Sequence, residues 1–316
     1  MSAPVVSPLE CWLPAWSRFD GASPWRTGML RADRLPAGPP GYLAGLASHF
    51  QGVGDSLPAA ALTRDYLLGD AGDASWLGAD PAWVQPDRNG ARLLACGQLR
   101  LSMPEALALA APLLPVFEEA GMRLEVSSPD RWHLRLPSDI PLPAFDAPEQ
   151  AMGEDLFLHL PQGPEGRRWR ILLNEVQVLL HQHPLNAERR TRGLPPINSV
   201  WLWGGGRLPA QLRSDLRGVI GDDLLLCALA RRAGVAQQAR RVEAVAQAGA
   251  GWLLDLQDVA VDELESVWWP ALQVAGRQQA LCYAFASGER WLHKPWHRLR
   301  VWRKAGSAKA TRGAVA

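Results

Sequence analysis

The sequence predicts an α/β protein whose C-terminal half is a partly parallel sheet flanked by helices, joined to an N-terminal α+β portion. Two observations support this class. Beyond residue 150, apolar runs of strand length alternate with helical patterns, which is typical of a parallel sheet. Before residue 137, pairs of short strands surround one helix. The chain of 316 residues is long enough for two small domains, and we place them at residues 1–150 and 151–316.

The N-terminal portion gives local signals of increasing strength. Residues 1–85 are rich in proline, glycine and alanine, with short helical candidates at 42–50 and 59–68. ARLLACGQLRLS then indicates two short strands around a glycine. Ser102 and Glu105 form a capping box that opens a helix containing two prolines, which should kink it. RLEV and RWHLRL, separated by SSPD, alternate apolar and polar residues and predict a half-buried hairpin.

The C-terminal portion follows PSDIPLPAFDAPEQ, residues 137–150, whose four prolines predict a linker. RRWRILLNEVQVLLHQH is the clearest helix, because its large apolar residues fall within one arc at 100 degrees per residue. INSVWLWGGG, RGVIGDD and GWLLDLQD each indicate a short buried strand, and ALCYAFASGERWLH indicates a hairpin. Between them, DLLLCALARRAG predicts a helix that begins at an aspartate cap and ends at a glycine.

Composition excludes several classes of protein. The 33 Lys and Arg nearly balance the 32 Asp and Glu, so no overall field recruits nucleic acid or an anionic membrane. No window reaches the ~18 apolar residues of a membrane span, and the N-terminus lacks the pattern of a signal peptide. The four cysteines form no C-x-x-C pair, so neither a zinc knuckle nor a redox dithiol is expected. The basic C-terminal end is expected to be solvated. We therefore expect a cytoplasmic protein without a membrane or nucleic acid partner.

The densest polar motif is HQHPLNAERRTRGLPPINSVWLWGGGRLP, residues 181–209. His183 precedes Pro184, which disfavours helical geometry and ends the helix there. The negative end of the helix dipole favours a protonated histidine, which beside Arg189, Arg190 and Arg192 could hold a phosphate or carboxylate. The alternative is that His183 and Asn186 cap a turn while the arginines face water.

Two further groups of residues are candidates for ligand contact. Gly204, Gly205 and Gly206 follow a buried strand, and ligands collect at the carboxyl ends of strands in parallel sheets. The run lacks the lysine and hydroxyl of a phosphate-binding Walker loop, and the same residues can make an ordinary turn. Asp222 and Asp223 could bind a divalent cation at a neighbouring strand end, although helix capping is the commoner role.

The order H-P-x-N-x-x-R-x-x-x-G-x-P-P-x-N, followed by W-L-W-G-G-G-R-x-P, resembles the archaeal-type cofactor-independent phosphoglycerate mutases of the alkaline phosphatase-like superfamily. The resemblance covers about residues 168–234. It implies that this neighbourhood lies near a bound phosphosugar acid. With the glycine run, Gly204 to Gly206, the positions it implicates in ligand binding are His183, Asn186, Arg189, Asn198 and Arg207.

Over a longer span, LGADPAWVQPDRNG, DRWHLRL, LLNEVQVLLHQHPLN and RVWRK resemble the RpfE-type regulatory protein family of proteobacteria, covering about residues 75–304. The superfamily's catalysis uses two divalent metals held by Asp and His clusters, with a Ser or Thr nucleophile. This chain has no Asp-His pair and no histidine between Pro184 and Leu292. Asp20 and Gly21 do not follow an apolar strand as the family's first metal ligand would.

These departures predict a metal-depleted, phosphoglycerate mutase-like regulatory protein with no metal or other cofactor. Its expected partners are a phosphorylated small molecule and a protein. One alternative is an active mutase or phosphatase with unorthodox ligands. The other is a structural or interaction module, in which Trp201 and Trp203 pack two subdomains together.

Overall fold

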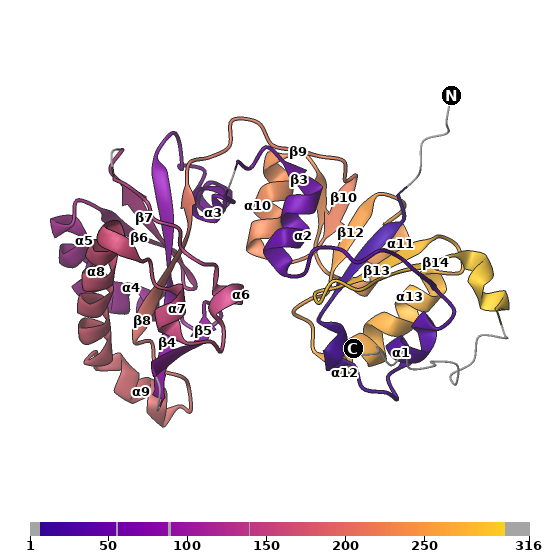
Figure 1. The fold of residues 1–316 in the computed structure, drawn as a ribbon, viewed down its shortest axis with the longest axis horizontal. Helices are drawn as coiled ribbons and strands as arrows, with labels where there is room; N and C mark the ends of the chain where they lie inside the picture. The colour runs from indigo at the N-terminus through magenta and orange to yellow at the C-terminus, as the bar shows by residue number, and fades with distance from the viewer. Residues whose placement is uncertain (1–6, 55, 88–89, 139, 301–316) are drawn as a thin grey trace, which may run out of the picture. The chain divides into compact units, whose positions relative to one another are not determined.

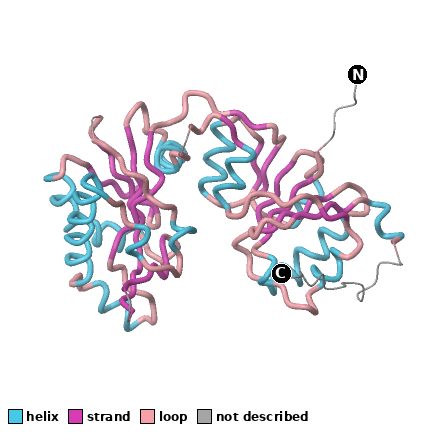
Figure 2. Tube along the Cα trace, in the orientation of Figure 1, coloured by secondary structure: helices cyan, strands magenta, loops and turns pink. Residues whose placement is uncertain are grey.

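The computed structural model describes residues 7–54, 56–87, 90–138 and 140–300. The chain forms two compact units: unit 1 combines residues 1–51 with 213–316, and unit 2 comprises residues 52–212. Unit 2 is therefore inserted into the chain of unit 1. Both units mix helices and strands (Figure 2), so the predicted α/β class is confirmed.

Unit 1 is built on a seven-stranded sheet with the order β11-β10-β12-β1-β13-β14-β2 (Figure 1). The strands from β11 to β13 pair in parallel, whereas β14 pairs antiparallel with both β13 and β2. A separate antiparallel pair joins β3 (Phe50–Gln51) to β9 (Arg213–Ser214). The strands of the sheet are β1 (Leu9–Leu13), β2 (Asp33–Arg34), β10 (Gly218–Ile220), β11 (Ala236–Gln238), β12 (Trp252–Asp255), β13 (Leu281–Phe285) and β14 (Arg290–His293).

Helices cover both faces of this sheet, as expected for parallel strands that are buried on both sides. On one face, alternate residues of β1 share a core with Trp25 of α1 and Leu272 of α13. On the other face, Trp12 packs against Tyr42 and Gly45 of α2. The helices of unit 1 are α1 (Pro24–Met29), α2 (Tyr42–His49), α10 (Leu224–Arg232), α11 (Val242–Gln247), α12 (Val261–Glu263) and α13 (Trp269–Ala275), with 3₁₀ helices η1 (Trp16–Arg18) and η4 (Pro295–Leu299) and a π-helix η3 (Leu264–Trp268).

Unit 2 contains a five-stranded antiparallel sheet with the path β5-β4-β7-β6, in which β8 also pairs with β4. The long strand β4 holds the sheet together because it pairs with β5, β7 and β8 along different parts of its length. Its strands are β4 (Ser75–Asp87), β5 (Gly90–Cys96), β6 (Arg123–Ser128), β7 (Arg131–Leu136) and β8 (Ser199–Gly206).

The core of unit 2 lies between this sheet and α8 (Gly163–His181), whose apolar arc buries Trp169, Leu172 and Val176. The predicted capping box is present: Ser102 and Glu105 exchange hydrogen bonds at the start of α4. The expected kink appears as a 3₁₀ turn between α4 and α5. The remaining helices are α3 (Ala59–Leu68), α4 (Met103–Ala110), η2 (Ala111–Leu113), α5 (Leu114–Glu119), α6 (Pro148–Ala151), α7 (Leu156–His159) and α9 (Leu185–Thr191).

Three expectations about organisation differ from the structure. The boundary at residue 150 falls inside unit 2, because Phe145 packs on Trp169 of α8 and the proline-rich segment 137–150 belongs to that core. The parallel sheet is not confined to the C-terminal half, since β1 lies between β12 and β13. The INSVWLWGGG strand, β8, pairs antiparallel with β4 in unit 2 and is absent from the parallel sheet.

The basic C-terminal tail predicted from the sequence, beyond residue 300, lies outside the described residues. Among the residues that are described, no helix combines the length and the apolar character that crossing a membrane requires.

Candidate functional site at the carboxyl edge of the parallel sheet

Asn186 and Arg189, two of the predicted ligand-binding residues, are buried in unit 2 and bind the backbone. The Asn186 side chain exchanges two hydrogen bonds of 2.8 Å with the backbone of Ile197 and donates another to Leu180 O. Arg189 has an exposed fraction of 0% and donates to Pro195 O at 2.9 Å and Leu99 O at 2.6 Å. The two side chains therefore fasten the segment between α9 and β8.

His183 and Asn198 also contact the backbone. Asn198 pairs with Val84 of β4 through both its amide oxygen and its amide nitrogen, at 2.9 and 2.7 Å. His183 Nδ1 accepts from Leu185 N–H, and Nε2 contacts Ala108 O at 3.2 Å. Both ring nitrogens of His183 are therefore engaged by the backbone of the protein.

The glycine run lies within β8 and not in a loop after it. Gly204 has a φ of +63°, and a Cβ there would lie 2.7 Å from the Cβ of Ala59 in α3. Gly205 packs beside Leu77, and Gly206 beside Pro58. These glycines therefore allow α3 and β4 to approach β8 closely. Arg207 follows the strand on the surface and is exposed.

The structure thus brings Asn186 and Arg189 together on one segment and gives the other predicted residues different partners. The two tryptophans of this strand have similar structural contacts. Trp201 donates its indole N–H to Asp146 O, and Trp203 donates to the buried carboxylate of Asp80.

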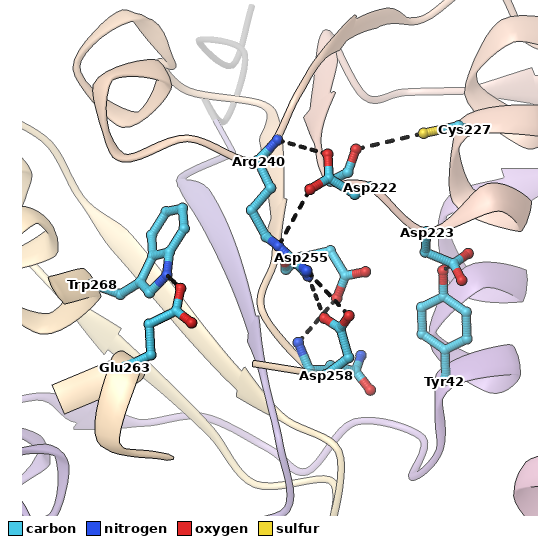
Figure 3. A network of polar contacts seen from close by, with 11 residues as sticks. Tyr42, Asp222, Asp223, Cys227, Arg240, Asp255, Asp258, Glu263 and Trp268 are labelled. Carbon is cyan, nitrogen blue, oxygen red and sulfur yellow. Dashed lines mark hydrogen bonds and ion pairs between the residues drawn. The ribbon is translucent and has the colours of Figure 1, made fainter. Parts of the chain in front are cut away.

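A different group of polar residues gathers at the carboxyl edge of the parallel sheet in unit 1 (Figure 3). Asp222 and Asp223 follow β10, while Asp255 ends β12 and Asp258 lies in the turn after it. The carboxyl ends of parallel strands meet at one edge, and this is where ligands of open α/β sheets usually bind. Of these four aspartates, only Asp222 and Asp223 were predicted from the sequence as candidates for ligand contact.

Arg240 links these carboxylates. Its guanidinium group forms a two-pronged ion pair with Asp258, and its Nε lies 3.8 Å from Asp222 Oδ2. Its backbone N–H donates to Asp222 Oδ1 at 3.0 Å. Burial alone would lower the pKa of Arg240, but the contact with Asp258 raises it above its ordinary value. The guanidinium group of Arg240 therefore already supplies a positive charge among the carboxylates of this edge.

Asp255 has an unusual protonation equilibrium. Its exposed fraction is 2%, and burial raises its pKa to about 7, even though Gln257 N–H donates to its Oδ1 at 3.2 Å. The neighbouring charges of Asp223 and Asp258 push the pKa in the same direction as burial. Perturbed carboxyl groups of this kind are found at functional sites more often than elsewhere.

Asp223 connects the edge to α2. It caps α10 by accepting the N–H of Leu226 at 2.9 Å, as the sequence predicted, and it accepts the hydroxyl of Tyr42 at 2.5 Å. Burial raises the pKa of Tyr42 well above 10, and the charge of Asp223 adds to this effect. The tyrosine therefore remains a hydrogen-bond donor at neutral pH.

A cavity of about 280 Å³ opens beside this network, lined by Trp12, Gln257, Arg290 and the glycine-rich turn that precedes α2. Inside it, His49 Nε2 lies 3.4 Å from Glu10 Oε1. Burial would raise the pKa of Glu10, yet the contact with His49 holds it below the ordinary value. The edge thus combines a carboxylate, an imidazole and a guanidinium group around an open space.

Within residues 7–54, 56–87, 90–138 and 140–300, no group of three or more His, Cys, Asp or Glu is arranged to hold a metal ion. The aspartates at the carboxyl edge are engaged instead by Arg240, Tyr42 and backbone amides.

Comparison with known proteins finds similarity over part of the chain, and no family model matches it. The chain is 33% identical over 89 residues to the 2,3-bisphosphoglycerate-independent phosphoglycerate mutase of Methanothrix thermoacetophila, covering 28% of this chain and 23% of that protein. It is 39% identical over 62 residues to the probable enzyme of the same description in Geobacter sulfurreducens, covering 20% and 16%. The matches therefore span less than a quarter of these curated relatives.

Among solved structures, the cofactor-independent phosphoglycerate mutase of Thermoplasma acidophilum aligns with a TM-score of 0.42 and 14% identity, over 98% of this chain and 96% of that one. The expected resemblance to cofactor-independent phosphoglycerate mutases is confirmed as a local sequence similarity.

Proposed function

We propose that this chain is a cytosolic regulatory protein of the RpfE type, related to phosphoglycerate mutases, that binds a small phosphorylated molecule and does not transfer phosphoryl groups through two metal ions. Local similarity to the mutases supports the relationship and the ligand class. The observation that carries the loss of metal-dependent transfer is the position of Arg240 among the aspartates of the carboxyl edge.

Divalent cations bind carboxylate oxygens that are ionised and free to reach the metal. At this edge the guanidinium group of Arg240 already pairs with Asp222 and Asp258, while Asp223 accepts hydrogen bonds from Tyr42 and a helix amide. A cation would have to displace the guanidinium group and also remove a proton that Asp255 holds near neutral pH. Both requirements weaken metal binding.

The first test is a substitution that removes the internal cation. Arg240→Met should turn the edge into a cluster of uncompensated carboxylates. We expect millimolar Mn²⁺ to raise the melting temperature of this variant by several degrees and to leave that of the wild type unchanged. Arg241→Met is the matched control, because Arg241 is the exposed neighbour of Arg240 and makes no ion pair with a described residue.

Stabilisation of the wild type by Mn²⁺, equal to that of the variant, would show that Arg240 does not block a metal site.

The binding part of the proposal is tested separately by measuring the melting temperature of the wild type with 3-phosphoglycerate, with and without Mg²⁺ or Mn²⁺. We expect 3-phosphoglycerate to raise the melting temperature without added metal. If no phosphorylated three-carbon acid changed the melting temperature, the proposed binding function would be contradicted.

An active mutase or phosphatase is the second candidate, because a carboxyl group with a pKa of about 7 is suited to transfer protons at neutral pH. Turnover of 3-phosphoglycerate by the wild type that disappears in Asp255→Asn would favour this candidate. Turnover that persists in the variant would indicate a contaminating enzyme.

A further inference from the structure

A cavity that is separate from the carboxyl edge lies in unit 1, beside α1, α13 and η4. Its volume is about 680 Å³, which falls within the ~300–1,000 Å³ typical of small-molecule sites. The wall includes the indole ring of Trp269, which packs against Trp25 at a ring-centroid distance of 4.7 Å. Gly28 belongs to the same wall, and a Cβ there would collide with Trp269 at 2.1 Å.

The charges around this cavity have one sign. Arg31, Arg277 and Arg298 line it from three separate segments, and no Asp or Glu is among its described lining residues. All three arginines are exposed, and none forms a side-chain hydrogen bond or an ion pair with a described residue. Elsewhere in the described part of unit 1, Arg240 and Arg300 pair with aspartates. The cavity therefore offers positive charge that the described chain leaves uncompensated.

Two buried polar atoms at the cavity also lack partners. Tyr283 has an exposed fraction of 1%, and its hydroxyl has no hydrogen-bond partner among the described residues. The Nδ1 atom of His293 is buried and unpartnered in the same sense. Tyr283 and His293 both belong to the cavity wall. Buried polar groups in folded proteins are almost always hydrogen-bonded, so two unpartnered groups on one cavity wall point to a bound species. Burial raises the pKa of Tyr283 well above 10, so its hydroxyl stays a donor.

We propose that this cavity is the binding site for a small phosphate-bearing anion, with Arg31, Arg277 and Arg298 supplying the charge and Tyr283 a buried hydrogen-bond donor. Guanidinium groups suit phosphate because they present planar donors to two oxygens at once. This inference rests on the proposed binding function and gives it a location. It does not depend on how Arg240 fills the carboxyl edge.

The experiment measures binding of inorganic phosphate and of 3-phosphoglycerate to the full-length chain by calorimetry, at an ionic strength held constant with NaCl. The test variant is Arg277→Gln with Arg298→Gln. The matched control is Arg18→Gln with Arg217→Gln, which removes the same charge from exposed positions of unit 1 outside the cavity. We expect the test variant to bind at least tenfold more weakly than the wild type, and the control to bind as the wild type does.

Tyr283→Phe provides a readout that a purely structural role would not give. Because the substitution keeps the ring and removes an unpaired buried hydroxyl, we expect the ligand-free variant to melt at or above the wild-type temperature. Its affinity for phosphate should nevertheless fall several-fold, because the donor to the anion is lost. A variant that binds as tightly as the wild type would overturn the role of Tyr283.

The possible results separate the two proposals. If the anions bind the wild type and the double variant equally, the assignment of the cavity fails while the proposed binding function stands. If neither anion binds the wild type, both fail. Binding of 3-phosphoglycerate tighter than that of inorganic phosphate supports a phosphate ester as ligand, and equal binding supports free phosphate at the same site.

Discussion

Asp255 shows how one residue sets a pH dependence. The unfolded chain ionises this group near pH 4, whereas burial raises the folded-state pKa to about 7. Between these values the folded chain holds a proton that the unfolded chain has released. The contribution of Asp255 to stability is therefore largest below pH 4, falls as the pH rises from about 4 to 7, and stays constant above that range.

Asp255→Asn should remove the loss of stability between pH 4 and 7, because asparagine keeps the acceptor for Gln257 N–H and carries no charge. We expect the variant to exceed the wild type in free energy of unfolding by about 2–4 kcal/mol at pH 8 and to approach it near pH 4. Urea denaturation across this range measures the difference. The exposed Asp262→Asn is the control, and a variant that follows the wild-type slope would disprove the buried, protonated state.

Arg189 shows how a side chain that resembles a ligand contact can serve the fold. Its guanidinium group is fully buried and donates to two carbonyl oxygens, while its Nη1 atom has no partner among the described residues. Replacing it leaves both carbonyls without donors, at a cost of about 1–3 kcal/mol each, partly offset by removing a buried charge.

We therefore expect Arg189→Met to lower the free energy of unfolding by about 2–3 kcal/mol, measured by urea denaturation. Arg190→Met is the matched control, since Arg190 is the exposed neighbour on α9, and it should change stability by less than about 0.5 kcal/mol. If Arg189→Met kept its stability but lost binding of 3-phosphoglycerate, the motif would be a ligand site after all.

At the scale of elements, the sequence predicted correctly the features that depend on residues close to one another in the chain. The capping box at Ser102, the hairpin of β6 and β7, and the buried face of α8 were all predicted correctly. Each depends on residues within a few positions of one another, through side-chain capping or through the periods of strand and helix.

Pairing between distant strands could not be predicted in this way. An apolar run such as SVWLWGGG indicates a buried strand but carries no information on its direction or its partner, so β8 was expected in the wrong sheet. The register Glu10↔Leu253 joins β1 to β12, and all of unit 2 lies between these two strands in the sequence.

The same limit explains why only part of the candidate site could be predicted from the sequence. Asp222 and Asp223 were noticed because they follow an apolar strand, and Asp255 follows GWLL in a similar way. Arg240 gave no local signal, because its importance depends on the turn after β12 meeting the loop after β11. A lone arginine in a loop is usually solvated.

At the scale of the whole molecule, one buried group in each unit should respond to acid in the opposite direction to the other. In unit 2, burial lowers the pKa of His133 to about 3, so its neutral form is favoured in the folded state. The contacts fit that form: Arg64 donates to Ser127 Oγ, Ser127 can then donate to His133 Nδ1, and Nε2–H can donate to Thr63 Oγ1. Protonation of His133 would add a hydrogen to Nδ1, so that this N–H and the hydroxyl hydrogen of Ser127 would point at each other.

The contribution of His133 to the stability of unit 2 should therefore be lost as the pH falls from about 6.5 towards 3, whereas the contribution of Asp255 to unit 1 grows as the pH falls from about 7 to 4. Hydrogen exchange followed by mass spectrometry at pH 7 and pH 5, corrected for the intrinsic exchange rate, should show weaker protection of β6 and β7 and stronger protection of β12 at pH 5. Parallel changes in both units would contradict the two assignments.

The insertion of unit 2 into unit 1 has a consequence for synthesis on the ribosome. Strand β1 is made before unit 2, but its neighbours β12 and β13 follow only after unit 2 has been translated. At roughly 5–20 residues per second, this apolar strand waits on the order of 10–50 s for its partners. Unit 2, whose strands all lie in one continuous segment, has every partner it needs during that interval. Nascent chains stalled before β12 should therefore present an unpaired β1 to chaperones.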